Sequence, residues 1–242
     1  LQYSKQVKGA AEVGANKIAY PDSSLSDQLA LVARLVAGGL QSKIFLVSQR
    51  GYDTHANQLY RQNTLMTELN DAVTAFTQDL NALGLQDRVM GMTLSEFGRR
   101  IKENGSSGTD HGTTAPMFFF GPQLNAGIYG AAPDLDNPDS RGDFVYDVHF
   151  RQAYASVLNQ WFGISDEALK LVFPANPNTL PLIRVTPSLD KVDFTGDGKL
   201  DFTDFISFAQ SFGSNNPKFD LDGDGTVGFS DFLTFADAFR NR

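Results

Sequence analysis

Carboxylate and imidazole side chains recur in three short segments of the sequence, each next to an apolar run. They are Asp53, His55, Glu96, Asp110 and His111. Such oxygen and nitrogen ligands suit zinc, manganese or iron. We therefore expect a site for Zn²⁺ or another transition metal, of the kind that assists hydrolysis. A plainer alternative is equally open, in which Asp53 caps the following helix and His55 bonds to a backbone carbonyl.

Two arginines follow Glu96 closely, at positions 99 and 100. A guanidinium group matches the shape and charge of a phosphate or sulfate group. Arg99 is therefore the candidate for a catalytic contact with an anionic substrate, and pairing with a surface acid is the alternative. For His149, the remaining histidine of the chain, we expect a place at the surface or in contact with the metal ligands without binding the metal itself.

A second pattern lies toward the C-terminus, where a 12-residue loop occurs twice with a period of 27 residues. Calcium takes about six to eight oxygen ligands, and such a loop supplies them from positions 1, 3, 5, 7, 9 and 12. In the first loop these are Asp193, Thr195, Asp197, the carbonyl of Lys199, Asp201 and Asp204. In the second loop they are Asp220, Asp222, Asp224, the carbonyl of Thr226, a water near Gly228, and Asp231.

Both loops have glycine at position 6, where the calcium loop turns sharply. Each leads into a segment with phenylalanine at helical spacing, and ten of the 20 phenylalanines lie in the last fifty residues. We therefore expect a small module with its own aromatic core and two Ca²⁺ ions that stabilise it. The alternative is that both loops are only solvated acidic turns.

Apolar periodicity predicts the elements that position these side chains. One predicted helix begins near residue 24 or 26, and two others span residues 57–83 and 150–162. The predicted buried strands are residues 43–48, 89–94 and 116–120. Strands that alternate with helices through short connections indicate an α/β class with a largely parallel sheet. Since ligand groups gather at the carboxyl ends of such strands, Asp53, His55 and Glu96 are expected to meet there.

Composition divides the chain into three parts. We expect an α/β domain over residues 1–173, a proline-rich linker over residues 174–189, and the calcium module over residues 190–242. The linker segment 174–187 contains four prolines and few charges.

Composition also excludes several classes of protein. The formal net charge of −8 argues against nucleic-acid binding. The chain has no cysteine, which excludes thiol catalysis, disulfides and cysteine-ligated zinc. No apolar run approaches the roughly 20 residues of a membrane span. Because the sequence begins at Leu1 without a signal peptide, we expect a processed form or a piece of a longer protein.

Several motifs resemble one bacterial family, the domain of unknown function 1501. They include Gly-Tyr-Asp-Thr-His at residues 51–55, Ser-Glu-Phe-Gly-Arg-Arg at 95–100 and Gly-Thr-Asp-His-Gly at 108–112. The resemblance covers roughly residues 20–163 and corresponds to the C-terminal half of that family's domain. It implies an exported, extracellular or periplasmic protein of the alkaline phosphatase and sulfatase superfamily, with a partial α/β/α sandwich.

The same resemblance implies how the site is assembled. Asp53, His55 and His111 would hold one metal, and Glu96 would approach a second. The nucleophile of such enzymes comes from the first strands of the fold, which would precede Leu1. The implied activity is hydrolysis of a phosphate or sulfate ester.

The duplicated loop, with one helix after each copy, resembles a type I dockerin module. That resemblance implies an EF-hand-like all-α fold and a cohesin-like or cell-surface partner. It also supports a rival function from another class, in which a non-catalytic first domain is anchored to a partner by the calcium-loaded tail.

Overall fold

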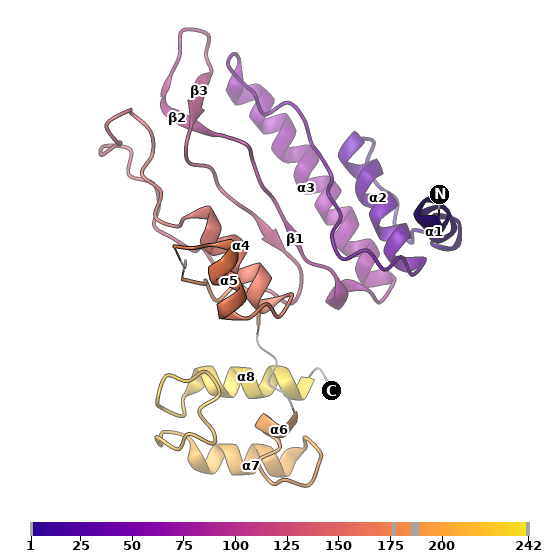
Figure 1. Ribbon diagram of the computed structural model, residues 1–242, viewed down its shortest axis with the longest axis vertical. Coiled ribbons are helices and arrows are strands. Elements are labelled where there is room, and N and C mark those ends of the chain that lie inside the picture. Colours follow the sequence, from indigo (N-terminus) through magenta and orange to yellow (C-terminus); the bar gives the residue numbers. More distant parts are fainter. Residues whose placement is uncertain (1, 176–177, 185–188, 241–242) are drawn as a thin grey trace.

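The computed structural model describes residues 2–175, 178–184 and 189–240. The described elements form two bodies, one with α1–α5 and β1–β4 and one with α6–α8 (Figure 1). The helices of the first body are α1 (Gln2–Val13), α2 (Ser24–Ala37), α3 (Gln58–Ala82), α4 (Phe150–Gln160) and α5 (Asp166–Val172), with the 3-10 turn η1 (Gln86–Arg88). Its strands are β1 (Gly91–Met92), β2 (Gly98–Glu103), β3 (Thr109–Gly112) and β4 (Phe119–Phe120).

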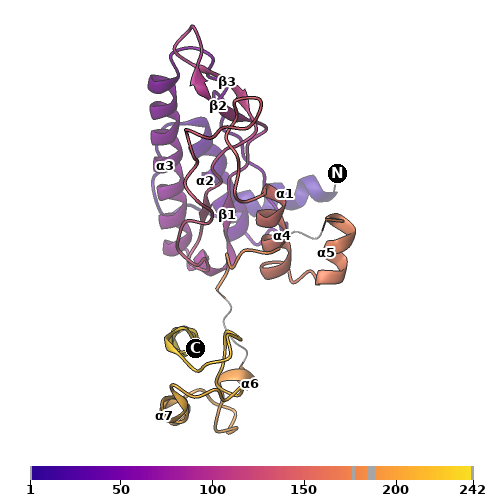
Figure 2. The same ribbon diagram turned by 90° about the vertical axis from the view of Figure 1, so that its left-hand side faces the viewer.

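The core of the first body lies between α2 and α3. Leu25, Leu29 and Val32 of α2 repeat at helical spacing and are buried against Phe76 and Leu80 of α3. The long helix α3 extends along most of the first body (Figure 2). Both helices were predicted from periodicity, and their ends follow local chemistry. The hydroxyl of Ser23 accepts from the Ser26 amide at the start of α2, and a glycine with φ +69° at residue 84 follows α3.

The sheets differ from the prediction. Strand β1 pairs with β4 and β2 pairs with β3, both antiparallel, so the largely parallel sheet is wrong for the described residues. The mixed α/β class holds, with much helix and little strand. The predicted strands at 89–94 and 116–120 shrink to two residues each.

The predicted buried strand over residues 43–48 is also wrong. These residues are extended without a ladder partner in the described chain. Ile44 and Leu46 are 76% and 82% exposed, whereas Phe45 and Val47 pack against the helical core. One face is therefore partly buried and the other is open, because α2 and α3 cover only one side. The side chain of Gln28 bonds to both the N–H and the C=O of Ser48 at 2.9 Å, in place of a strand neighbour.

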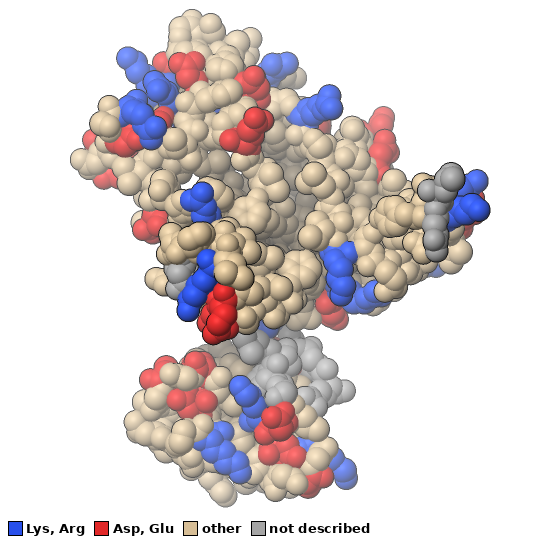
Figure 3. Space-filling view, viewed as in Figure 1, with Lys and Arg blue, Asp and Glu red and all other residues tan. Residues whose placement is uncertain are grey.

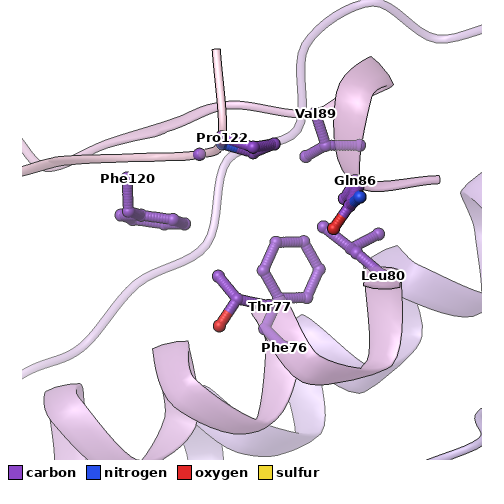
Figure 4. Close-up of a pocket in the computed structure, with 8 residues that line it drawn as sticks. Phe76, Thr77, Leu80, Gln86, Val89, Phe120 and Pro122 are labelled. Atoms are coloured by element: carbon purple, nitrogen blue, oxygen red, sulfur yellow. The ribbon is translucent and has the colours of Figure 1, made fainter. Parts of the chain in front are cut away.

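A hollow of about 290 Å³ lies between α3 and the segments around β1 and β4 (Figure 4). Its lining is Phe76, Thr77, Leu80, Gln86, Val89, Phe120, Gly121 and Pro122. This lining holds no charged side chain, so the hollow lacks the groups that metal or anion chemistry requires. No helix among the described residues is both long and apolar enough to cross a membrane.

The second body comprises α6 (Leu189–Val192), α7 (Phe202–Ser211) and α8 (Phe229–Arg240). Its core contains Phe194, Phe208 and Phe235, whose rings lie 5.6–6.2 Å apart. The aromatic core was predicted from the sequence, whereas the four-residue helix α6 before the first loop was not.

Part of the segment predicted as a linker packs on the first body. Leu182 and Ile183 are buried. The Asn125 amide donates to the Leu182 carbonyl at 2.9 Å, and the Arg184 amide donates to the Gln123 carbonyl at 2.8 Å. Residues 176–177 and 185–188 of the predicted linker lie outside the described residues.

Candidate metal centres

A β-hairpin and the segment before α3 together build the first candidate site, at the tip of the first body (Figure 1). In the hairpin, Arg99 of β2 faces His111 of β3. The Asn104 carboxamide closes the turn, since its oxygen accepts from the amides of Ser106 and Gly108 at 2.9 and 3.2 Å. Its nitrogen donates to the His55 carbonyl at 3.0 Å, which ties residues 52–55 to the turn.

Gly108 is where the two segments come closest. A Cβ added there would lie 2.3 Å from the carbonyl carbon of His55 and 2.6 Å from the carbonyl oxygen of Thr54. Since these are backbone atoms, no side-chain rotation can relieve the contact. Glycine at position 108 therefore allows His55 to lie beside β3.

Three ligand atoms converge at this tip, one each from Asp53, His55 and His111. Asp53 Oδ1 lies 3.0 Å from His55 Nε2 and 2.8 Å from His111 Nε2, and the two Nε2 atoms are 3.2 Å apart. Tetrahedral ligands about 2.0–2.1 Å from a zinc ion are roughly 3.3 Å from one another. The spacing and the donor set therefore fit one zinc-like ion with three protein ligands.

The cluster is open to solvent on one side. The side chains of Asp53, His55 and His111 are 62%, 48% and 46% exposed. A catalytic zinc site has three protein ligands and leaves one position for water or substrate. The exposure of the cluster is what such an open position requires.

The hydrogen bond from His111 is the first cause that holds the pKa of Asp53 below its usual value, and the charges of His55, His111 and Arg99 add to it. Partial desolvation acts in the opposite direction and is outweighed. Asp53 is therefore ionised near neutral pH, as a metal ligand must be.

Arg99 lies behind the ligands with a side chain only 18% exposed. Its guanidinium donates to the carbonyls of Tyr52 and Thr109, the latter at 2.7 Å, and lies 3.5 Å from Asp53 Oδ1. It thus joins the segment before Asp53 to β3. Among the described residues, the hydrogen bonds of Arg99 go to protein carbonyls, so the geometry favours a structural role in joining the two segments over a substrate contact.

His111 is oriented by an aromatic ring. Phe97 stacks on its imidazole at 3.8 Å between centroids and 6° between planes. The guanidinium carbon of Arg99 lies over the Phe97 ring, 5.1 Å from its centroid. Phe97, Asn104 and Gly108 are the site residues that the sequence analysis missed. The Asn-Gly pair at residues 104–105 was the available signal, because that dipeptide favours hairpin turns.

The remaining predicted residues lie at different distances from the cluster. Asp110 Oδ1 is 3.4 Å from His55 Nδ1, on the far side of the ring from the converging atoms. Glu96 is exposed and is not one of the converging residues. His149 caps α4, where its Nδ1 accepts from the Arg151 amide at 3.1 Å.

The two acidic loops form the second candidate site. In each loop the aspartate at position 1 accepts from backbone amides at positions 4 and 6: Asp193 from Gly196 and Gly198, and Asp220 from Gly223 and Gly225, all at 2.6–2.9 Å. Those four glycines have φ between +77° and +92°, which favours glycine.

The last aspartate of each loop is also held by the backbone. Asp204 and Asp231 are fully buried. Asp204 accepts from the amides of Thr195 and Asp201, and Asp231 accepts from those of Leu221, Asp222 and Gly228. In the second loop, carboxylate oxygens of Asp220, Asp222 and Asp224 converge within 4.8 Å. Oxygen donors alone, on a loop of this length, fit calcium better than zinc.

Charges of both signs are interspersed on the face drawn in Figure 3, where Lys and Arg lie among Asp and Glu.

A family model described as "Protein of unknown function (DUF1501)" matches residues 4–170. The comparisons with curated proteins and with solved structures give no match.

Proposed function

The chain belongs to the DUF1501 family, and from this premise we propose that its first domain is a metal-dependent hydrolase of phosphate or sulfate esters. The observation that carries the proposal is the convergence of Asp53, His55 and His111 within 3.2 Å. Zinc is the first candidate, since two imidazoles and a carboxylate are a usual zinc ligand set. The resemblance to alkaline phosphatases and sulfatases supports the choice of ester.

The residues of the chain have separate tasks in this proposal. Asp53, His55 and His111 would hold the ion, which when bound polarises an ester oxygen and stabilises the charge that develops there. Arg99 holds the two ligand-bearing segments together through the carbonyls of Tyr52 and Thr109. We assign the nucleophile to no described residue. Thr54 lies between Asp53 and His55 in the sequence, but it is fully buried and its hydroxyl donates to the Tyr52 carbonyl.

In finer detail we propose that the first domain is part of an α/β/α sandwich. The extended segment 44–50 supports this, because Phe45 and Val47 contact the helical core while Ile44 and Leu46 face outward. That alternation is typical of a strand with one face covered. We also propose, from the family resemblance, that the protein acts outside the cytoplasm.

Calorimetric titration of the full chain with Zn²⁺, at saturating calcium, tests the proposed metal site. We expect one zinc site that is lost in His55→Ala and in His111→Ala. The matched control is His149→Asn, which removes the third imidazole but keeps a residue suited to cap α4. A folded protein without a zinc site, or with one unaffected by both alanine variants, contradicts the proposal.

Hydrolysis is tested separately with 4-nitrophenyl phosphate and 4-nitrophenyl sulfate. Zinc-dependent turnover of either ester that His55→Ala abolishes supports the hydrolase. Zinc binding without turnover favours the rival function, in which the first domain is not catalytic.

A second function is favoured by the paired acidic loops. We propose that the tail is a dockerin-like module that binds two Ca²⁺ ions and anchors the chain to a cohesin-like or cell-surface partner. The supporting observation is that both loops place the position-1 aspartate on the amides of positions 4 and 6. Calorimetry is expected to give two calcium sites in the native chain and one in Asp220→Ala. Fewer than two sites in the native chain contradicts this proposal.

A further inference from the structure

The imidazole of His55 lies between two carboxylates. Its Nε2 is 3.0 Å from Asp53 Oδ1, and its Nδ1 is 3.4 Å from Asp110 Oδ1. Asp53 belongs to the converging group, whereas Asp110 does not. The two carboxylates therefore contact opposite nitrogens of one ring, and they cannot serve the same purpose there.

A neutral imidazole has one nitrogen that donates and one that accepts. Only the accepting nitrogen can bind a metal, and the partner of the other nitrogen decides which tautomer is present. An ionised carboxylate only accepts, so Asp110 beside Nδ1 favours the proton on Nδ1. The lone pair of His55 is then left on Nε2, which faces Asp53 and His111.

The contact between the two histidines fits the same arrangement. Their Nε2 atoms are 3.2 Å apart, and His111 Nε2 is also 2.8 Å from Asp53 Oδ1. Two neutral rings this close avoid repulsion when a single proton lies between their Nε2 atoms. Asp53 Oδ1 is hydrogen-bonded to His111 Nε2 at 2.8 Å, and its contact with His55 Nε2 is longer, at 3.0 Å. The shared proton is therefore favoured on His111, which leaves His55 Nε2 as the acceptor.

The two histidines are oriented by different means. His111 is stacked on Phe97, with 6° between the ring planes. His55 has a looser ring contact with His111, at 4.9 Å and 27°. A carboxylate at Nδ1 therefore has more effect on the orientation of the His55 ring than it would have on that of His111.

We propose that Asp110 is a positioning residue that holds His55 in the Nδ1–H tautomer, so that Nε2 is free to bind the metal. This inference rests on the proposed metal site. It also changes the role expected for Asp110, from a ligand to a group that acts through His55. Loss of such a partner typically weakens metal affinity about 10- to 100-fold.

The test uses the full chain at saturating calcium, with Zn²⁺ as the probe. Asp110→Asn is expected to weaken zinc binding about tenfold or more, and Asp110→Glu to recover part of it. The control Glu103→Gln removes one negative charge from the same hairpin and is expected to leave the affinity within twofold. Unchanged affinity in Asp110→Asn overturns the inference.

Nitrogen-15 NMR of the imidazoles, in the metal-free protein at a pH where the histidines are neutral, gives the second readout. We expect His55 to be mainly Nδ1–H in the native chain, with more Nε2–H in Asp110→Asn and no change at His111. A weaker zinc affinity with an unchanged His55 tautomer would assign Asp110 to direct ligation and overturn the inference. Because the tautomer is measured without metal, it tests the positioning role even if the native chain binds no zinc, which would contradict only the proposed function.

Discussion

The exposed cluster of the first body and the acidic loops of the second hold their carboxylates by different means. In the cluster, Asp53 and His111 come from segments 58 residues apart and meet only through the hairpin contacts. In the loops, Asp220 is held by amides of Gly223 and Gly225, three and five residues away. A site with contiguous ligands thus contains its own scaffold, whereas a dispersed site depends on the surrounding fold.

The two sites also relate differently to the cores. Helices α2 and α3 form an apolar core to which Asp53, His55 and His111 do not belong. The core of the second body is small, and Asp204 and Asp231 are fully buried, each four residues before a core phenylalanine on the same helix, Phe208 or Phe235. We therefore expect metal removal to leave the first body folded and to unfold the second.

The largest effect that sharpens this contrast is expected from calcium removal. Chelation should melt residues 190–240 and leave the first body folded, because the aspartates of the loops would repel one another without an ion. A ligand at about a thousandfold excess over its Kd stabilises a folded state by about 4 kcal/mol, a large fraction of the stability of so small a module.

The aromatic residues allow the two bodies to be followed separately. The only tryptophan, Trp161, and all seven tyrosines lie before residue 190. Fluorescence thermal melts should therefore be unchanged by chelator, while far-UV circular dichroism loses the helical signal of α7 and α8. Calcium, but not magnesium, should restore that signal. Superimposable dichroism melts with and without chelator would contradict the prediction.

Local patterns in the sequence predicted the helices well. Apolar spacing located α2, α3 and α4 within a few residues, because a helix satisfies its own backbone and exposes one stripe to the core. Helix α1 was missed because its sequence is polar and Ala10 is its one buried apolar residue among those described, and α5 because it has only seven residues. Strands were predicted poorly, since a strand depends on neighbours that a single segment does not reveal. Residues 43–48 have the composition of a buried strand but lack a ladder partner in the described chain.

The candidate sites were predictable to different degrees. Asp53, His55 and His111 were predicted as ligands from the sequence, and they converge. It could not foresee that Asp110 contacts the other nitrogen of His55, or that Arg99 bonds to two carbonyls. Both features depend on the register between β2 and β3, and neither of these strands was among the predicted ones.

A smaller effect is expected when the contact between the two ligand-bearing segments is widened. Gly108→Ala would place a methyl group 2.3 Å from the His55 carbonyl carbon, so residues 54–55 must move. We expect a zinc affinity at least tenfold lower and a loss of about 1–3 kcal/mol in stability. The control is Gly105→Ala in the same turn, where an added Cβ meets nothing within 4 Å. Equal zinc affinities in the two variants would show that the cluster does not depend on this approach.

The smallest effect concerns acid pH and tests whether Asp53 is held by His111 in the metal-free protein. The hydrogen bond from His111 lowers the pKa of Asp53 in the folded state. A carboxylate with a lowered pKa contributes stability above its unfolded pKa, and that contribution is lost as the pH falls through the folded value. The stability difference between the native chain and Asp53→Asn should therefore be present at pH 6 and shrink below about pH 4. Denaturant unfolding followed by Trp161 fluorescence measures it, with Asp136→Asn as an exposed control outside the cluster. A difference that is the same at pH 6 and pH 3 would mean that the Asp53 contact with His111 does not depend on the ionised carboxylate. The site would then be held by other contacts between the two segments, such as those of Asn104 and Arg99.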